Sequence, residues 1–447
     1  MIGEKCHRFE MKQEITITKQ VPCVATYDTV VCGGGPAGFV AAIAAAREGA
    51  KVALVERFGF LGGMATAGLV APLSVFTYSG ERVIGGIPYE FIERLESMGG
   101  AYIEQPLGNV AFDAELYKLC VQRMVLEAGV SLYTNSYVSG VECDGGRLTH
   151  VIIENKNGTE ALSAKCFIDC TGDGDIAYMA GVPMQERAAG VPLQPLSTYF
   201  VLAGVDTSSP RINEAMHHNK QGVNCHCLPL RERLLELQEE LNIPTFGGPW
   251  FCTMLHEGVV AVNMTRTAGD ACDNRNYMEA ECRLREDVFR MAAILRDNFE
   301  EFRNCYVAAV ATQAGIRETR RIRGCHTITA EEYRTAYRYA DSVSRGAHPI
   351  DIHSTDGSSQ KTEFLESPAY VPYRALYAAG FPNLLVAGRS LSAEREAFAS
   401  LRVQASCMGT GQAAGVAAAM AAKADCGVGE VDVEALVERL REIGANI

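Results

Sequence analysis

The chain has 447 residues, of which 48% are hydrophobic and 21% charged, and its formal net charge is −13 at pH 7. A chain of this length is too long to fold around one simple hydrophobic core, so we expect two domains or one elaborate domain. The acidic balance argues against a nucleic-acid partner and against an anionic membrane surface. No apolar run reaches the ~18 residues of a membrane span. The polar N-terminal stretch lacks the apolar centre of a secretion signal, which favours a cytoplasmic protein.

A strand–helix–strand pattern opens the folded part of the chain. Residues 29–32 (TVVC) form a short apolar run that predicts a buried parallel strand. Residues 37–49 predict a helix that ends at Gly49, and residues 51–56 predict a second strand.

Three glycines between the first strand and the helix follow the spacing GxGxxG. We expect Gly33 to make the tight turn, Gly35 to let the backbone approach a pyrophosphate, and Gly38 to let helix and strand pack closely. The free N–H groups and positive dipole end of the helix would then face the phosphates. Glu56 stands 23 residues after Gly33, near the place of an acid that accepts ribose hydroxyls. A glycine turn of structural use only would leave Glu56 unexplained, so the pattern predicts a dinucleotide site.

The next segment favours FAD over NAD. Residues 57–68 (RFGFLGGMATAG) form a second glycine-rich loop directly after the acid. With this loop the chain resembles the glutathione-reductase-type FAD superfamily, and more narrowly its FAD-dependent oxidoreductases, which are distantly similar to fumarate reductase and succinate dehydrogenase flavoproteins. The resemblance covers about residues 25–425. The loop has no histidine at the place where fumarate-reductase relatives often link their flavin, so we expect non-covalent FAD.

The resemblance implies an α/β protein whose Rossmann-like FAD-binding domain is built from two chain segments, with an inserted α+β substrate domain. The expected boundaries are 25–195 and 345–447 for the FAD-binding domain and 196–344 for the insertion. Within the insertion, residues 231–242 and 275–299 predict amphipathic helices. No second GxGxxG follows a strand, so we expect no built-in NAD(P)H domain and a separate electron acceptor.

Two later segments extend the resemblance. Residues 133–181 hold two strands around the hairpin signal Asn157-Gly158 and close in TGDGD (171–175), which resembles the second FAD-contacting loop of the family. Residues 383–420 resemble its closing segment, a strand followed by an Ala-rich helix that we expect to open at residues 409–412. The resemblance implies FAD contacts for Gly33, Gly35, Pro36, Ala37, Gly38, Glu56, Arg57, Gly62, Gly63, Met64, Ala65, Thr66, Val138, Thr171, Gly172, Asp173, Gly388, Arg389, Gly409, Thr410, Gly411 and Gln412.

Candidate substrate-binding residues come from an arginine cluster. Arg317, Arg320 and Arg321 in GIRETRRIRG would share one face of a helix and could clamp a substrate carboxylate or the FAD. The alternative is a surface ion-pair network with Glu318. Arg389 follows Gly388 at a strand end, where ligands of open α/β sheets bind.

Candidate proton-transfer residues come mainly from the stretch PIDIH. On a strand, Asp351 and His353 would point the same way, and His353 is our first choice of general base because its pKa is easily tuned. A structural histidine is the competing interpretation. His256 and Tyr373 complete the set of candidate catalytic residues. Residues 344–364, which include PIDIH, are the most loop-like long stretch.

Taken together, the sequence predicts an FAD-dependent oxidoreductase that transfers a hydride between a small anionic organic substrate and FAD. A non-redox flavoprotein, such as an isomerase or a modification enzyme, and a protein-binding module on the same fold stay open as alternatives. The sequence also leaves homo-oligomerisation open. Its 16 cysteines form no CxxC pair, and we expect them to be reduced, buried thiols. A redox role stays open for the pair Cys225 and Cys227.

Overall fold

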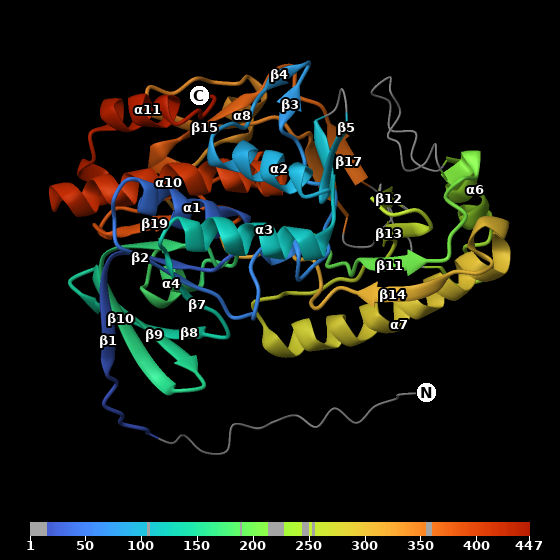
Figure 1. The fold of residues 1–447 in the computed structure, drawn as a ribbon, viewed down its shortest axis with the longest axis horizontal. Helices are drawn as coiled ribbons and strands as arrows, with labels where there is room; N and C mark the ends of the chain where they lie inside the picture. The colour runs from blue at the N-terminus through green and yellow to red at the C-terminus, as the bar shows by residue number, and fades with distance from the viewer. Residues whose placement is uncertain are drawn as a thin grey trace.

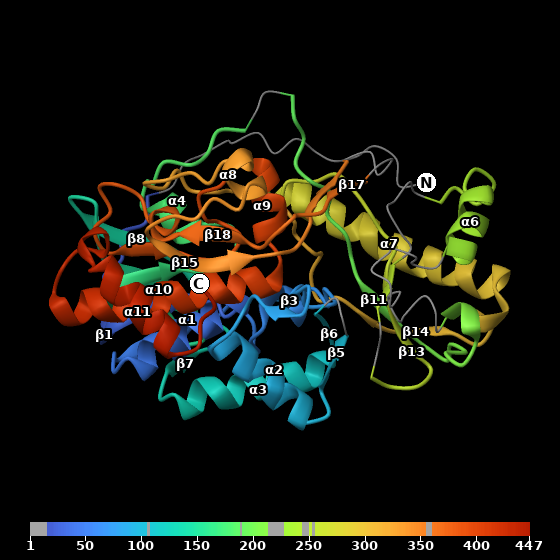
Figure 2. The same ribbon diagram turned by 90° about the horizontal axis from the view of Figure 1, so that it is seen from above.

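The computed structural model describes residues 16–104, 108–187, 190–212, 228–243, 250–252, 255–354 and 360–447. Figure 1 shows a larger body, which contains the first and last described parts of the chain, and a smaller lobe formed by residues between 200 and 310. Figure 2, turned by 90°, shows this lobe extending to one side of the larger body. The two parts each have their own hydrophobic core.

The larger body is built on a seven-stranded sheet. Its strands are β1 (Cys23–Cys32), β2 (Val52–Val55), β7 (Ser131–Tyr133), β8 (Tyr137–Asp144), β9 (Arg147–Asn155), β10 (Gly158–Asp169) and β19 (Leu384–Val386). The order is β7-β2-β1-β10-β9-β8, and β19 also pairs with β10. Strands β7, β2, β1, β10 and β19 are parallel, whereas β9 and β8 add antiparallel neighbours. The parallel part carries the Rossmann-like arrangement that was predicted.

The predicted strand–helix–strand unit is confirmed as β1, α1 (Pro36–Arg47) and β2. Proline stands in the first turn of α1, where its missing N–H costs nothing. Gly49 follows the helix with φ +90°, a conformation that glycine adopts without strain. The hairpin predicted around Asn157 and Gly158 is confirmed as β9 and β10, which pair in antiparallel register.

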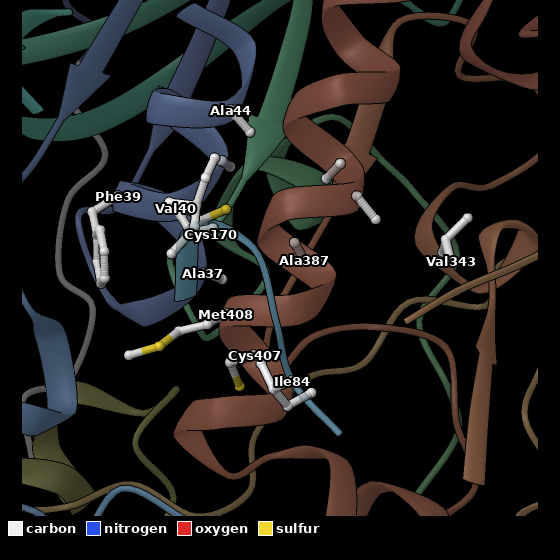
Figure 3. Close-up of a cluster of buried hydrophobic side chains, with 14 of the residues drawn as sticks. Ala37, Phe39, Val40, Ala44, Ile84, Cys170, Val343, Ala387, Cys407 and Met408 are labelled. Carbon is white, nitrogen blue, oxygen red and sulfur yellow. The ribbon is translucent and has the colours of Figure 1, made fainter. Parts of the chain in front are cut away.

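Helix α10 (Gln404–Ala424) lies beside α1, and small residues allow the contact. A Cβ on Gly411 would come within 2.1 Å of the Ala37 carbonyl oxygen, and one on Gly415 within 2.3 Å of the Ala41 carbonyl oxygen. Figure 3 shows Ala37 of α1 near Met408 of α10, with Ala44 further along α1. The two helix backbones therefore touch with no side chain between them.

The expected start of this helix at residues 409–412 is wrong. The helix begins at Gln404, and the buried residues Cys407 and Met408 belong to it. Glycine at 409 and 411 had suggested the start of the helix, but both glycines lie inside it and allow close packing against Ser344 and Ala37.

The remaining elements of the larger body surround this sheet and helix pair. The helices are α2 (Ile87–Ser97), α3 (Ala114–Glu127), α4 (Asp175–Met179), α8 (Ala330–Arg334), α9 (Arg395–Leu401) and α11 (Val433–Glu442), with short turns η1 (Gly63–Ala65), η3 (Tyr373–Leu376) and η4 (Val428–Glu430). Strand pairs are β3 (Thr77–Tyr78) with β4 (Glu81–Arg82), β5 (Ala101–Glu104) with β6 (Asn109–Phe112), β15 (Ser342–Gly346) with β18 (Ala369–Pro372), and β16 (Ile350–His353) with β17 (Gln360–Glu363).

The loop expected at residues 344–364 is wrong for the described part of that stretch. It contains most of β15 and the whole of the β16–β17 pair. The β-branched residues Ile350 and Ile352 suit a strand, and Ile350 is fully buried. The prediction gave too much weight to the glycine, serine and proline residues around them.

The smaller lobe is a four-stranded antiparallel sheet with the order β12-β13-β11-β14. These strands are β11 (Phe200–Ala203), β12 (Trp250–Cys252), β13 (Val259–Asn263) and β14 (Tyr306–Val310), and α6 (Leu228–Glu236), α7 (Asn274–Asn298) and η2 (Glu300–Phe302) belong to the same lobe. The predicted helix at 275–299 is confirmed as α7, and the one at 231–242 corresponds to the shorter α6. Ile328, Tyr333 and Val343 fall within the predicted insertion (196–344), and their side chains lie in the core of the larger body. The domain boundaries stay a prediction.

No helix in the described ranges has the length and apolar content needed to cross a membrane. The same ranges contain no group of three or more His, Cys, Asp or Glu side chains placed to hold a metal ion. Cys225 and Cys227 lie outside the described residues.

Candidate active site

A hollow of about 80 Å³ lies where β1, β2, β10 and β19 end. Open parallel sheets bind their ligands at this edge. Thirteen residues with a predicted FAD contact line this nucleotide hollow: Gly33, Gly35, Pro36, Ala37, Glu56, Arg57, Gly63, Met64, Thr171, Gly172, Asp173, Gly388 and Arg389. Four separate chain segments thus meet at one place.

The three fingerprint glycines each have a distinct steric environment. Gly33 has φ +98°, and a Cβ there would lie 2.4 Å from the Cys170 carbonyl oxygen. A Cβ on Gly38 would lie 1.7 Å from the Gly33 carbonyl oxygen, so this position requires glycine for close packing. Gly35 has no neighbour closer than 3.7 Å to such a Cβ, so the space beside it is free for a ligand.

The start of α1 is suited to an anionic ligand. No side chain caps this helix, so its first N–H groups have no side-chain partner there. Such groups, together with the positive dipole end, bind phosphates. The glycine cradle and this uncapped helix start fit the pyrophosphate of FAD.

Glu56 is held rigidly at the end of β2. Its Oε2 accepts a hydrogen bond from the Gly34 N–H at 2.7 Å, and its Oε1 accepts one from the Phe58 N–H at 2.9 Å. Burial raises the pKa of Glu56, while these two hydrogen bonds and the charge of Arg57 oppose the rise. Each carboxylate oxygen can accept a further hydrogen bond, which leaves capacity for ribose hydroxyls.

Asp173 connects the loop at residues 171–175 to Arg389, which lies just after the end of β19. Its Oδ1 accepts hydrogen bonds from Thr319 Oγ1 at 2.8 Å and from Arg389 Nη2 at 3.0 Å. Gly172 has φ +85°, and a Cβ there would meet the Arg389 guanidinium at 2.7 Å. This loop and Arg389 therefore form one unit at the rim of the hollow.

Nine residues with a predicted FAD contact are absent from the lining of the hollow: Gly38, Gly62, Ala65, Thr66, Val138, Gly409, Thr410, Gly411 and Gln412. Several of them shape their surroundings instead. Thr66 Oγ1 donates to the Leu61 carbonyl oxygen, and Gln412 Oε1 accepts the Ile87 N–H at 2.7 Å. Their predicted roles stay untested.

Sequence reasoning missed six lining residues: Phe58, Cys170, Gln313, Ile316, Ala387 and Cys407. Cys170 and Ala387 directly follow strands, so their position at strand ends was a usable signal. Gln313 and Ile316 come from a distant segment and gave no local signal.

A larger cavity of about 320 Å³, here called the chamber, adjoins the nucleotide hollow. Met64, Ile316 and Arg389 line both spaces. The chamber also receives Arg317, Asp351 and His353, so three predicted catalytic residues (Arg317, His353 and Arg389) come together there.

The expected helix through Arg317, Arg320 and Arg321 is wrong, because residues 315–321 contain no helical turn. Arg317 is buried, and its Nη1 donates to the Pro195 carbonyl oxygen and to Ser197 Oγ, both at 2.8 Å. Arg320 instead pairs with Asp175 at 2.8 Å, and Arg321 with Glu318 at 2.9 Å. An extended chain sends the three guanidinium groups to different places, and of the three only Arg317 lines the chamber.

His353 and Asp351 lie on one strand, β16, where their spacing predicted that both side chains point the same way, and they form a hydrogen-bonded pair. His353 Nε2 lies 3.0 Å from Asp351 Oδ2, and Arg402 Nη2 lies 3.5 Å from the same oxygen. Burial and the nearby charge of Arg317 lower the pKa of His353 to about 3. Burial alone would raise the pKa of Asp351, but His353 and Arg402 hold it well below its usual range. The pair is therefore a neutral imidazole beside an ionised carboxylate.

The other two candidate catalytic residues do not line the chamber. His256 is exposed, and its Nε2 lies 2.9 Å from Asp113 Oδ2. Tyr373 is fully buried, and its hydroxyl donates to the Val428 carbonyl oxygen at 2.7 Å. Sequence reasoning missed His348 and Arg402, which do line the chamber.

A parallel sheet with a glycine fingerprint, a buried acid after β2 and a second loop at 171–175 defines an FAD-type dinucleotide-binding protein. The family model described as FAD-dependent oxidoreductase matches residues 28–440, and the chain belongs to this family. FAD is accordingly its cofactor, and the chain is an oxidoreductase of the flavoprotein class.

Individual relatives are similar over shorter parts. Dihydrolipoyl dehydrogenase of Trypanosoma brucei brucei is 60% identical over 42 residues, which is 9% of each chain. Thiamine thiazole synthase of Pyrococcus horikoshii is 28% identical over 185 residues, covering 37% of this chain and 68% of the relative. Among solved structures, a geranylgeranyl bacteriochlorophyll reductase-like protein from Thermoplasma acidophilum aligns over 94% of this chain and 83% of its own, with 13% identity and a TM-score of 0.46.

Proposed function

We propose that this flavoprotein transfers a hydride between a small anionic organic substrate in the chamber and non-covalently bound FAD, and that a separate acceptor takes the electrons onward. The observation that supports this is the shared boundary of the two spaces. Met64, Ile316 and Arg389 line both, so a ligand in the chamber would lie next to the cofactor site. Bound FAD supplies the two-electron redox chemistry.

Arg317 is the proposed anion-binding residue. Its guanidinium is buried, and its recorded partners, Pro195 and Ser197, are both neutral. A buried cation whose hydrogen-bond partners are all neutral is costly, and a substrate carboxylate would supply a directly bonded counter-charge in a two-pronged arrangement.

His353 is the proposed general base. A carboxylate can only accept hydrogen bonds, so the contact with Asp351 places the imidazole hydrogen on Nε2. Nδ1 is then the nitrogen able to take a proton from a substrate carbon or hydroxyl. Asp351 fixes this tautomer and stabilises the imidazolium that forms.

Anaerobic reduction tests the proposal directly. Purified protein with FAD bound is mixed with panels of organic acids, amines and polyols, and the visible flavin absorbance is followed. We expect bleaching with one or more organic acids, and a much slower reaction when Arg317 is replaced by Lys. Bleaching by amines or polyols alone would contradict the anionic substrate.

The similarity to thiamine thiazole synthase over 185 residues supports a second candidate, a non-redox modification enzyme. The same experiment separates the two. A substrate that is converted while the flavin stays oxidised throughout would favour this second function.

A further inference from the structure

One wall of the chamber is strongly cationic. Arg402 directly follows α9, and its Nη2 donates to the Asp351 carbonyl oxygen at 3.1 Å. Arg266 is buried behind Asn263, which lines the chamber, and donates to Asn263 Oδ1 at 2.5 Å. Burial and the neighbouring guanidinium groups of Arg266 and Arg402 lower the pKa of Arg317. The carboxylate of Asp351 thus contacts Arg402 directly and also acts electrostatically on Arg317 and Arg266.

Several donors on this wall have no partner within the described part of the chain. One is Nε of the lining residue Arg402, and the others lie behind the lining: Nε and Nη2 of Arg266, which contacts Asn263, and Nε2 of the fully buried Gln194, whose Oε1 accepts the His353 N–H. Asp351 accepts hydrogen bonds from His353, from Gln360 and from Arg402 Nη2, and none of these comes from the donor atoms named above. Buried donors without acceptors are costly and indicate a missing anionic ligand.

A second wall of the chamber is apolar. It is formed by residues 70–72 (Val-Ala-Pro) and by Phe251. Val70 and Ala71 pack against Tyr199 and Ala261 of the smaller lobe, which holds this wall in place. The Val70 carbonyl oxygen accepts a hydrogen bond from Gln404 Nε2 at 2.7 Å, and the Ala71 carbonyl oxygen accepts one from the Tyr199 hydroxyl at 3.1 Å, so both carbonyl groups already have partners.

We infer that the substrate of the reaction proposed above is an organic acid with an apolar body. Its anionic head binds Arg402 and Arg317, and its apolar body lies against residues 70–72 and Phe251. This inference rests on the proposed function, because it names the ligand of the same chamber. Arg402 thereby becomes a specificity-determining residue that no sequence motif indicated. Arg389 also lines the chamber, but its Nη2 pairs with Asp173 at the cofactor side at 3.0 Å.

The two walls make different demands on a ligand. A head group rich in acceptors satisfies the cationic wall, whether it is a carboxylate or a phosphate. Each methylene of the ligand that moves from water to the apolar wall should raise the affinity about fourfold. A cavity of about 320 Å³ is near the lower end of the ~300–1,000 Å³ typical of small-molecule sites, so this gain must stop after a short chain.

Ligand titration of the FAD-loaded protein tests the inference without requiring turnover. Straight-chain carboxylates of increasing length are added, and the perturbation of the flavin absorbance gives each dissociation constant. Alcohols and alkyl phosphates of the same lengths form two further series. We expect affinity to rise about fourfold per methylene over the first few carbons, and the alcohols to bind at least tenfold more weakly than the acids. The phosphate series decides which anionic head is preferred.

Two variants locate the walls. Arg402→Gln should weaken all acids by one common factor of tenfold or more. Val70→Thr, which adds a hydroxyl at nearly constant size, should instead flatten the dependence on chain length. Arg323→Gln is the matched control, since Arg323 is exposed and pairs with Glu186 at 3.3 Å. If Arg402→Gln fails to hold FAD, the length series on the unaltered protein still decides the question.

Each outcome has a defined meaning. Equal affinity for short and long acids, equal affinity for acids and alcohols, or no binding of any acid would overturn the inference. If acids bleach the flavin but their affinity does not depend on chain length, the proposed redox function is supported and the apolar body of the substrate is contradicted. If affinity depends on chain length but no acid bleaches the flavin, the inferred class of ligand is supported and the proposed hydride transfer is contradicted.

Discussion

His353 Nε2 lies 3.0 Å from Asp351 Oδ2, two positions away on the same strand, and this pair faces the chamber. The strand repeat of two residues places both side chains on one face. Burial and the charge of Arg317 lower the pKa of His353 to about 3, so the imidazole is neutral in the folded protein. An unfolded chain, in contrast, protonates this histidine near its ordinary pKa of ~6.5.

This difference predicts a pH-dependent stability. Because the folded-state pKa of His353 is depressed, its contribution is fully present above pH ~6.5 and is lost as the pH falls toward 3. Between pH 7 and pH 5 the loss from this one group should be about 2 kcal/mol. Urea unfolding of the wild type and of His353→Gln at both pH values measures it. The variant should lose less stability than the wild type, and His150→Gln, a half-buried histidine on β9, should behave like the wild type.

The cofactor prediction concerns Gly35. A Cβ at this position meets nothing in the protein closer than 3.7 Å, so the protein itself leaves room for that atom. A branched side chain would occupy the space of the pyrophosphate, and Gly35→Val should therefore purify folded but without flavin colour. Gly140→Val on β8, away from the hollow, is the control. A folded Gly35→Val with a normal flavin spectrum would contradict the assigned pyrophosphate site.

The α1–α10 contact predicts an unusual response to alanine. In an exposed helix interior, Gly→Ala gains about 1 kcal/mol of stability. At Gly411 the added Cβ would lie 2.1 Å from the Ala37 carbonyl oxygen, so Gly411→Ala should instead lose roughly 1–3 kcal/mol. Denaturant unfolding checks the sign. Gly140→Ala, whose Cβ would meet Ile152 at an ordinary 3.5 Å, should change stability far less.

Arg317 and Arg389 should respond differently to lysine. Lysine keeps the charge but cannot form two parallel hydrogen bonds. Arg317→Lys should lower kcat/KM by about tens to several hundred fold, which corresponds to ~2–4 kcal/mol, at unchanged flavin content. Arg389→Lys should lower flavin content as well, because Arg389 ties the 171–175 loop through Asp173. Wild-type kinetics and flavin content in both variants would show that neither guanidinium touches a ligand.

Electron transfer onward is predicted to need a separate acceptor. A single GxGxxG fingerprint follows a strand in this sequence, and that fingerprint forms the FAD hollow. Mixing the oxidised protein with NADH or NADPH in a stopped-flow instrument, without any partner, should leave the flavin absorbance unchanged over the turnover time. Rapid reduction by either nucleotide would overturn this prediction. Quinones, oxygen and small redox proteins are then compared as acceptors of the substrate-reduced protein.

The sequence by itself determined the elements whose signals are local. The glycine spacing, the apolar runs on both sides and Glu56 lie within 28 residues, and they were sufficient for the β1–α1–β2 unit and for a dinucleotide site. The glycine-rich loop that follows, residues 57–68, and the family resemblance then favoured FAD. The alternation in PIDIH was likewise enough to place Asp351 and His353 on one face of a strand. Each of these signals depends on neighbours that the backbone repeat brings together, so no knowledge of the remaining fold was required.

Only the tertiary structure decided how distant segments share one chamber. The arginines of GIRETRRIRG suit a helix face by spacing, yet the chain there is extended and Arg317 alone reaches the chamber. Arg402 follows a different helix and comes beside Asp351 through packing across 51 positions of sequence. The start of α10 was misjudged because its glycines serve contact with α1 and not a turn. Long-range packing selects among locally acceptable conformations, and residues brought together in this way carry no shared signal in the sequence.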